Sequence, residues 1–145
     1  MADVARQTIT VNATSEHCFA VVTDFEQYPD WAKDVKEAIV RVRDEQGRAT
    51  EVEFRASALG RSTHYTLHYD YGEAPDSLSW KLVRGDIMRA IDGKYTFHTT
   101  AAGTQVDYDL SIELVVPLPG FVKRRAEVRI LNTVRELKTR VESLS

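Results

Sequence analysis

Pro117-Leu118-Pro119-Gly120-Phe121 opens the stretch that decides the fold, because no proline or glycine follows Gly120 in the residues up to Ser145. Pro119 suits a helix start, since its φ is preset and the first turn does not need its missing N–H. Apolar residues then recur at spacings of three and four, which predicts one stripe along a long helix. The stripe comprises Val122, Ala126, Ile130, Val134, Leu137, Val141 and Leu144. Burying each large side chain is worth roughly 1.5–3 kcal/mol, so this helix needs a broad apolar surface to lie on.

Strands are predicted for most of the chain upstream of this helix. Between Val35 and Leu114, apolar and polar residues alternate in six segments, which is typical of strands with one buried face. Clusters of turn residues such as Asp44-Glu45-Gln46-Gly47 separate the segments. Short turns favour antiparallel neighbours, and a meander of this size twists and curls.

The first part of the chain adds one strand and two short helical segments. Thr8–Val11 alternates polar and apolar residues and is predicted as the first strand. Asn12 or Thr14 can cap a helix over about residues 15–22, and residues 25–31 are predicted as a bent helical turn. The predicted fold is therefore α+β, with a seven-stranded curved antiparallel sheet around a long C-terminal helix and two short helices after the first strand.

Composition limits the classes of protein to consider. The 145 residues are expected to form one domain, 1–145, and 43% hydrophobic with 28% charged residues is usual for a globular protein. The net charge of −3 gives no reason to expect nucleic acid as a partner. No run reaches the ~18 apolar residues of a membrane span, and Met1 to Gln7 lacks the apolar core of a signal peptide. A cytoplasmic location is therefore expected. Cys18 is the only cysteine, which excludes an internal disulfide.

The inward face of the predicted sheet is rich in large rings with polar tips. Tyr65, Tyr69, Trp80, Tyr95 and Tyr108 fall on inward positions of their strands. A core made only for packing would use Leu, Ile and Val, whereas buried Tyr and Trp need hydrogen-bond partners. The rings therefore favour a small-molecule cavity between sheet and helix, and the alternative is that they fill the curl of the sheet.

The order of elements and several motifs resemble the polyketide cyclase/dehydrase and lipid-transport family. The resemblance lies in residues 22–31, in Asp92-Gly93-Lys94-Tyr95-Thr96-Phe97, in Gly103-Thr104-Gln105-Val106 and in Leu118-Pro119-Gly120-Phe121. That family belongs to the START-like helix-grip superfamily, which also includes Bet v 1-like proteins. The resemblance spans nearly the whole chain and implies a deep, largely apolar pocket. It does not choose between ligand carriers and cyclases, because one fold serves both.

The predicted ligand-binding residues combine the inward strand positions with the start of the last helix. They are Phe54, Tyr65, Leu67, Tyr69, Trp80, Leu82, Arg89, Tyr95, Phe97, Tyr108, Leu110, Phe121 and Arg125. Arg89 and Arg125, with the tyrosine hydroxyls, are the groups that could orient a substrate or move a proton. The alternative for both arginines is a charge at the rim that extends over apolar neighbours.

Other chemistry has no sequence signature. His64 and His68 share an outward strand face but lie ~13 Å apart, too far to bind one metal ion. His98 also alternates outward, and there is no glycine-rich phosphate loop and no inward carboxylate pair. We therefore expect no metal and no cofactor, and catalytic residues remain unassigned.

Three functions are compatible with these patterns. The first is binding or transport of a hydrophobic small molecule such as a lipid, a quinone or a polyketide-like compound. The alternative is a polyketide cyclase/dehydrase that acts by positioning its substrate, and the third is a protein-interaction module. The protein is expected to be a monomer or homodimer.

The last stretch is also basic. Residues 117–145 hold seven basic and three acidic residues, so the rest of the chain is acidic. Lys123-Arg124-Arg125 after Phe121 could dock on an anionic membrane, giving a weak peripheral contact, or bind an acidic ligand headgroup at the pocket mouth. The alternative is that the basic helix simply matches the acidic body.

Overall fold

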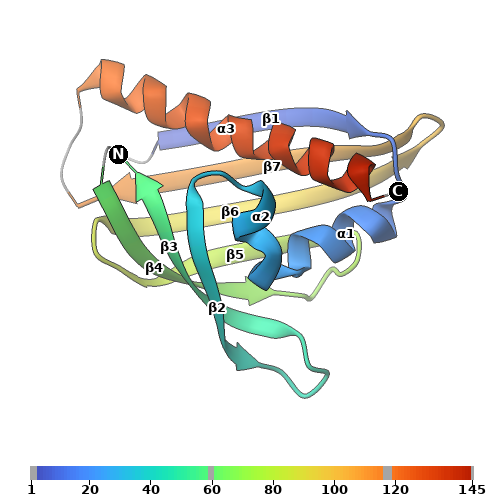
Figure 1. The fold of residues 1–145 in the computed structure, drawn as a ribbon, viewed down its shortest axis with the longest axis horizontal. Helices are drawn as coiled ribbons and strands as arrows, with labels where there is room; N and C mark the ends of the chain where they lie inside the picture. Colours follow the sequence, from blue (N-terminus) through green and yellow to red (C-terminus); the bar gives the residue numbers. More distant parts are fainter. Residues whose placement is uncertain (1–2, 59–60, 116–118, 145) are drawn as a thin grey trace.

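One curved antiparallel sheet dominates the computed structural model, with its strands in the order β1-β7-β6-β5-β4-β3-β2 (Figure 1). The structure describes residues 3–58, 61–115 and 119–144. The strands are β1 Asp3–Val11, β2 Val35–Arg43, β3 Ala49–Ala58, β4 Arg61–Asp70, β5 Ser77–Gly85, β6 Met88–Thr100 and β7 Gly103–Leu114. Each strand from β2 to β7 pairs with the next along the chain, and β1 closes the sheet on β7. The predicted α+β fold is confirmed, although β1 begins earlier than the predicted Thr8.

The described residues also form four helical segments, which lie between and after these strands. They are α1 Ser15–Thr23, the single 3₁₀ turn η1 Phe25–Gln27, α2 Tyr28–Trp31 and α3 Gly120–Ser143. Thr14, not Asn12, caps α1, because its hydroxyl accepts a hydrogen bond from the backbone N–H of His17 at 3.1 Å. η1 and α2 together make the bent helical turn predicted for residues 25–31.

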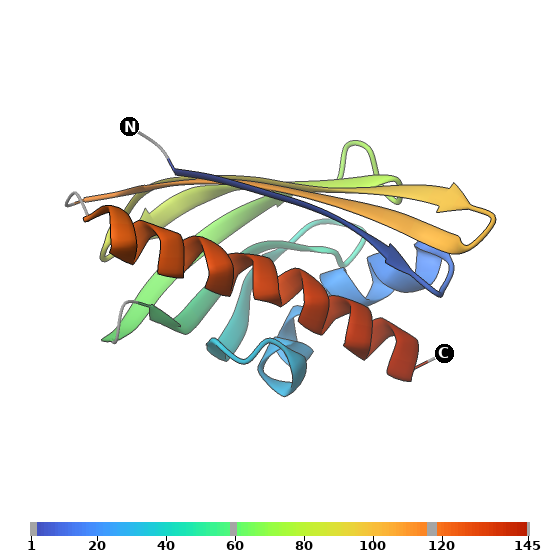
Figure 2. The same cartoon turned by 90° about the horizontal axis from the view of Figure 1, so that it is seen from above.

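Helix α3 faces the concave side of the sheet. The short helices α1 and α2 lie beside the second half of α3 (Figure 2). Val134, Leu137 and Val141 are fully buried, as the predicted stripe requires. The prediction for Leu144 was wrong: it is 53% exposed, because it follows the last residue of α3 at the helix end. Val122, Ala126 and Ile130 belong to the same predicted stripe, but their side chains lie outside the described part.

Polar contacts hold α3 at both sides of the concave face. Glu142 accepts a hydrogen bond from the backbone N–H of Asn12 at 2.8 Å, which ties the helix end to the loop after β1. The guanidinium of Arg129 pairs with both carboxylate oxygens of Asp34, in the connection between α2 and β2. The helix is thus fixed to segments that are far apart in the sequence. No described helix is long and apolar enough to cross a membrane.

Candidate functional site

Strand register gathers the inward rings into one layer on the concave face. Tyr69 pairs with Trp80, Trp80 with Gly93, and Gly93 with Leu110, so these four residues form a row across β4 to β7. Tyr95 and Tyr108 pair in the next row. Cross-strand partners point to the same face of a sheet. The aromatic residues that the sequence predicted to face inward therefore lie next to one another in the folded sheet.

Trp80 lies at the centre of this layer. Its ring centroid is 5.8 Å from that of Tyr69, 5.3 Å from Tyr95 and 6.0 Å from Tyr108. The indole lies directly over Gly93: a Cβ added to this glycine would be only 2.1 Å from Cε2 of Trp80. Gly93 therefore gives Trp80 the space to lie across β6.

Four tyrosine hydroxyls on this layer have no partner among the residues that the structure describes. Those of Tyr65, Tyr69, Tyr95 and Tyr108 make no hydrogen bond with any described residue, in contrast to Tyr28 and Tyr71. Yet among the described residues no enclosed side-chain oxygen or nitrogen lacks a partner. The four hydroxyls must therefore border a space large enough for water. A polar tip that borders such a space inside an aromatic layer is typical of a ligand pocket.

Burial extends the pH range in which these phenols stay neutral. Desolvation raises the pKa of Tyr69, Tyr95 and Tyr108 well above the usual value near 10. Desolvation, aided by the nearby Asp34 carboxylate, also raises the pKa of Tyr65 to about 12. All four hydroxyls are therefore uncharged hydrogen-bond donors at neutral pH.

The short helices add rings that the predicted set does not include. Phe25 of η1 packs on Tyr69 with centroids 4.4 Å apart, and Tyr28 of α2 lies 5.9 Å from Phe54. Tyr28 donates to the Val22 carbonyl at 2.5 Å, and Tyr71 donates to the Ala49 carbonyl at 2.7 Å. The aromatic composition of residues 25–31 was the sequence signal for these rings. The predicted set lacks them because it was built from alternation within strands, which cannot show where a helix contacts the sheet.

Most predicted ligand-binding residues lie on the concave side as expected. Tyr65 and Leu82 are half-buried, and the other strand positions apart from Arg89 are buried. These buried residues are Phe54, Leu67, Tyr69, Trp80, Tyr95, Phe97, Tyr108 and Leu110. The structure therefore contains the aromatic layer that the sequence predicted. The role of this layer as a binding site stays a prediction.

The inward placement of Arg89 was wrong. The register shifts between Met88 and Ala90, so an extra residue enters β6 and the alternation is lost at this point. Met88 is buried, whereas the Arg89 side chain is 62% exposed and lies 3.6 Å from Glu113 in an ion pair. Arg89 is therefore a surface charge.

The two predicted site residues on α3 also lie at the surface. Phe121 is 63% exposed, and Arg125 is exposed as well. They are four residues apart and share the outer face of the first half of the helix, opposite the buried Val134, Leu137 and Val141. Neither side chain belongs to the aromatic layer.

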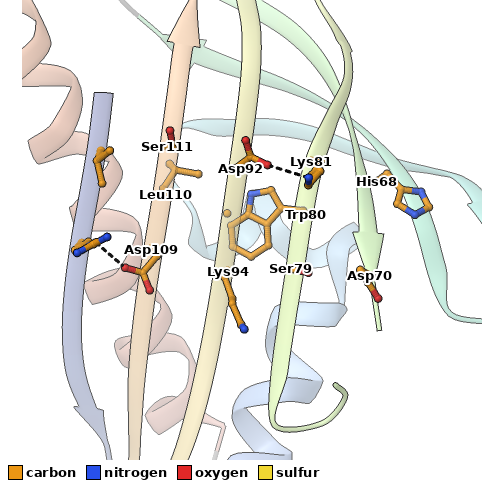
Figure 3. A pocket seen from close by; sticks show the side chains of 13 residues that line it. His68, Asp70, Ser79, Trp80, Lys81, Asp92, Lys94, Asp109, Leu110 and Ser111 are labelled. Atoms are coloured by element: carbon orange, nitrogen blue, oxygen red, sulfur yellow. Dashed lines mark ion pairs between the residues drawn. The ribbon is translucent and has the colours of Figure 1, made fainter. Parts of the chain in front are cut away.

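The convex face carries a shallow hollow of about 440 Å³ (Figure 3). Charged side chains stand around it, and Trp80 and Leu110 lie at its floor beside Gly93. Arg6 pairs with Asp109 at 3.1 Å and Lys81 with Asp92 at 3.7 Å. Such exposed cross-strand pairs are typical of a solvated sheet surface, so the hollow has no evident chemistry of its own.

The histidines lie outside the layer, as the alternation predicted. His64, His68 and His98 are exposed, and His98 pairs with Asp107 at 3.1 Å. No group of three potential metal-ligating side chains occurs in the part of the chain that the structure describes. The arrangement offers neutral hydrogen-bond donors and ring surfaces.

Comparison with known proteins places the chain in a family. The family profile described as polyketide cyclase / dehydrase and lipid transport matches residues 2–142. The chain belongs to this family. No curated protein matches it.

Several solved structures are similar to this member of the polyketide cyclase/dehydrase and lipid-transport family over nearly its whole chain. A START superfamily protein from Mycobacterium smegmatis has 24% identity and a TM-score of 0.89, with 98% of this chain and 99% of that chain covered. The Zhui aromatase/cyclase from Streptomyces sp. R1128 has 14% identity and a TM-score of 0.80, with 98% and 94% covered. The ginseng major latex-like protein 151 from Panax ginseng has 12% identity and a TM-score of 0.73, with 97% of each chain covered. At these identities the likeness establishes the START-like fold alone.

Proposed function

We propose that this protein binds a hydrophobic small molecule between α3 and the concave face of the sheet. The observation that carries the proposal is the set of four tyrosine hydroxyls on a ring-rich wall that make no hydrogen bond with a described residue. The wall offers a large apolar area, and the hydroxyls border a space that water can enter. A ligand that fills this space would gain burial energy and pair the hydroxyls. The family description, which includes lipid transport, supports this reading.

Binding of a ligand fits the described residues of the concave face better than catalysis does. The polyketide cyclase/dehydrase alternative requires groups that remove and return protons. Apart from the tyrosines and Cys18, the buried polar side chains of the described residues are Thr63, Thr66, Ser77 and Thr104, and none of these four is ionisable. The raised pKa values of Tyr95 and Tyr108 make these phenols poor proton donors and keep them protonated, so they can donate hydrogen bonds but offer no phenolate to act as a base. We therefore infer binding or transport as the main activity.

The test is a titration of Trp80 fluorescence in a Trp31→Phe background. Trp31 is also buried and lies 4.9 Å from Tyr28, so its removal isolates the signal of Trp80. A fatty acid, a quinone and a flat polyphenol are the probes, and mass spectrometry of molecules that copurify gives an independent readout. We expect at least one probe to change the emission at micromolar concentration. If all three leave it unchanged at tens of micromolar and nothing copurifies, the binding proposal is wrong.

The outer face of α3 favours an additional weak contact with an anionic bilayer. Phe121 and Val128 are 63% and 59% exposed, and the exposed Arg124 and Arg125 lie between them on the first half of the helix. Apolar side chains next to cations suit the boundary of a negatively charged membrane. Each basic residue near such a surface is worth ~1 kcal/mol, so the contact would be reversible and sensitive to salt.

Cosedimentation with vesicles tests this contact. We expect binding to phosphatidylserine vesicles at low salt, little binding to phosphatidylcholine vesicles, and loss of binding when Lys123, Arg124 and Arg125 are all changed to Gln. The charge-matched control changes Arg6, Lys81 and Lys94 to Gln on the convex face and should keep the binding. Equal loss in both triple variants would show that only net charge matters, which contradicts a docking surface on α3.

A further inference from the structure

Helix α3 is attached to the two edges of the sheet in different ways. β1 and β2 are the edge strands, and α3 lies beside β1 (Figure 2). On the side of β2, α3 reaches residues 32–34, which connect α2 to that strand. There Arg129 pairs with Asp34, and Glu136 accepts a hydrogen bond from the backbone N–H of Lys33 at 3.3 Å. Two polar contacts therefore tie α3 to the β2 side of the sheet.

The pair of Asp34 and Arg129 is well oriented but open to solvent. Nε of Arg129 donates to one carboxylate oxygen at 3.2 Å, and a second guanidinium nitrogen donates to the other oxygen. Two such bonds fix the relative orientation of the groups. The backbone carbonyl of Asp34 accepts from Ser57 on β3 at 2.8 Å, which holds the carboxylate side of the pair in place. The Arg129 side chain is 63% exposed, so water and salt can compete for it.

The same pair lies at the solvent-facing corner of the aromatic layer. Tyr65 is half-buried, whereas Tyr69, Tyr95 and Tyr108 are buried. Desolvation raises the pKa of Tyr65, and the Asp34 carboxylate adds to the rise, so Asp34 and Tyr65 lie close together. On this side, therefore, the layer of tyrosine hydroxyls approaches solvent next to the pair.

The two halves of α3 depend on this pair to different degrees. Val134, Leu137 and Val141 are fully buried, so packing holds the second half whether or not the pair is intact. In contrast, the side chains that the structure describes between residues 119 and 129 are all exposed. Local opening begins in segments with few buried contacts. Loss of the pair should therefore release the first half of α3 while the core stays folded.

We propose that the ion pair between Asp34 and Arg129 is a latch that controls access to the ligand site. When the pair breaks, the first half of α3 moves away from residues 32–34, and a ligand passes beside Tyr65. This inference rests on the proposed binding function and adds how access to that site is regulated. Since the latch acts on the route and not on the bound ligand, it sets the rates of entry and exit and leaves the affinity unchanged.

Amide hydrogen exchange of the full chain measures the latch without any ligand. Arg129→Gln and Asp34→Asn should each speed exchange in peptides from the first half of α3 by about three- to tenfold. The double variant should have no larger effect, because either single change already breaks the pair. Arg135→Gln is the matched control. It removes one positive charge from the same helix, but Arg135 is exposed and makes no ion pair with a described residue, so exchange should stay at the wild-type rate.

Stopped-flow fluorescence with the uncharged probe N-phenyl-1-naphthylamine measures access to the site. In Arg129→Gln, association and dissociation should both become about three- to tenfold faster, and Kd should change by less than about twofold. Sodium chloride at about 1 M screens charges beyond ~3 Å, so the wild-type rates should approach those of the variant. Arg135→Gln should keep the wild-type rates and their dependence on salt.

Four results would count against the inference or against the function on which it rests. Equal exchange in Arg129→Gln and Arg135→Gln would show that the pair does not hold α3. Faster exchange with unchanged probe rates would show that ligands enter elsewhere. An increase in the dissociation rate alone would show that Arg129 contacts the ligand, which also overturns the latch. If exchange rises but neither this probe nor the fatty acid, quinone and polyphenol bind, the proposed function is wrong, whereas the hold of the pair on α3 stands.

Discussion

Gly93 is the residue on which the shape of the aromatic layer depends. Antiparallel register places it opposite Trp80 on β5, and its missing side chain lets the indole cross β6. Any other residue at this position would displace the ring, whose centroid lies 5.3 Å from that of Tyr95 and 6.0 Å from that of Tyr108. The close contact with the Trp80 indole explains why a glycine occupies this position inside a strand.

Gly93→Ala should therefore destabilise the protein and move Trp80. The added Cβ would lie 2.1 Å from Cε2 of Trp80, so the ring must shift, at a cost of about 1–3 kcal/mol. Urea denaturation and tryptophan emission in the Trp31→Phe background measure the two effects. Gly72→Ala is the control, because its Cβ would meet only the end of the flexible Asp70 side chain at 3.1 Å. Equal unfolding midpoints for the two variants would contradict the contact.

At the scale of elements, α3 divides into two halves with different roles. Val134, Leu137 and Val141 in its second half are fully buried against the core, and Glu142 is bonded to the backbone of Asn12. In the first half, Phe121, Arg124, Arg125 and Val128 are exposed. The second half therefore anchors the helix, and the outer face of the first half is available for a partner.

Leu137→Ala should consequently cost about 2–5 kcal/mol of unfolding free energy, since it removes a fully buried side chain and leaves a cavity. Val128→Ala on the same helix is the control and should change stability by less than about 0.5 kcal/mol, because Val128 is 59% exposed. Chemical denaturation followed by circular dichroism measures both. A comparable loss in the two variants would mean that the first half of α3 packs as tightly as the second.

At the scale of the whole molecule, the buried phenols couple stability to alkaline pH. Burial raises the pKa of Tyr28, Tyr69, Tyr95 and Tyr108 well above the value near 10 that a tyrosine has in an unfolded chain. Above that value the unfolded chain loses phenol protons that the folded protein keeps. The folded state is therefore favoured less and less as the pH rises.

We expect the contribution of these phenols to the free energy of unfolding to be constant below about pH 10 and to fall steeply above it. For Tyr65 the loss extends to its folded pKa of about 12, and the raised pKa values of the other four tyrosines add to the loss above pH 10. Urea unfolding at a series of alkaline pH values, with tyrosinate absorbance as a second signal, measures the slope. Tyr95→Phe should reduce it by roughly one proton. A slope that this variant leaves unchanged would mean that the Tyr95 hydroxyl is freely solvated.

The sequence by itself determined the order of elements and most of the inward face. Alternation within a strand and the spacing of Val134, Leu137 and Val141 are local properties, so they can be read without knowing what lies opposite. This is why the α+β fold and the rings at Tyr69, Trp80, Tyr95 and Tyr108 were predicted correctly. Family membership, which the profile match establishes, follows from the same local motifs.

Tertiary structure alone decided what depends on contacts between distant residues. The shifted pairing of β6 with β7 turns Arg89 outward, and no pattern within β6 reveals it. Whether a tyrosine hydroxyl makes a hydrogen bond also depends on its surroundings. Tyr71, just after β4, reaches the Ala49 carbonyl on β3, whereas Tyr95 finds no partner among the described residues. Hydrogen bonds act over about 3 Å, so only the folded chain fixes which of these chemically identical groups remain available for a ligand.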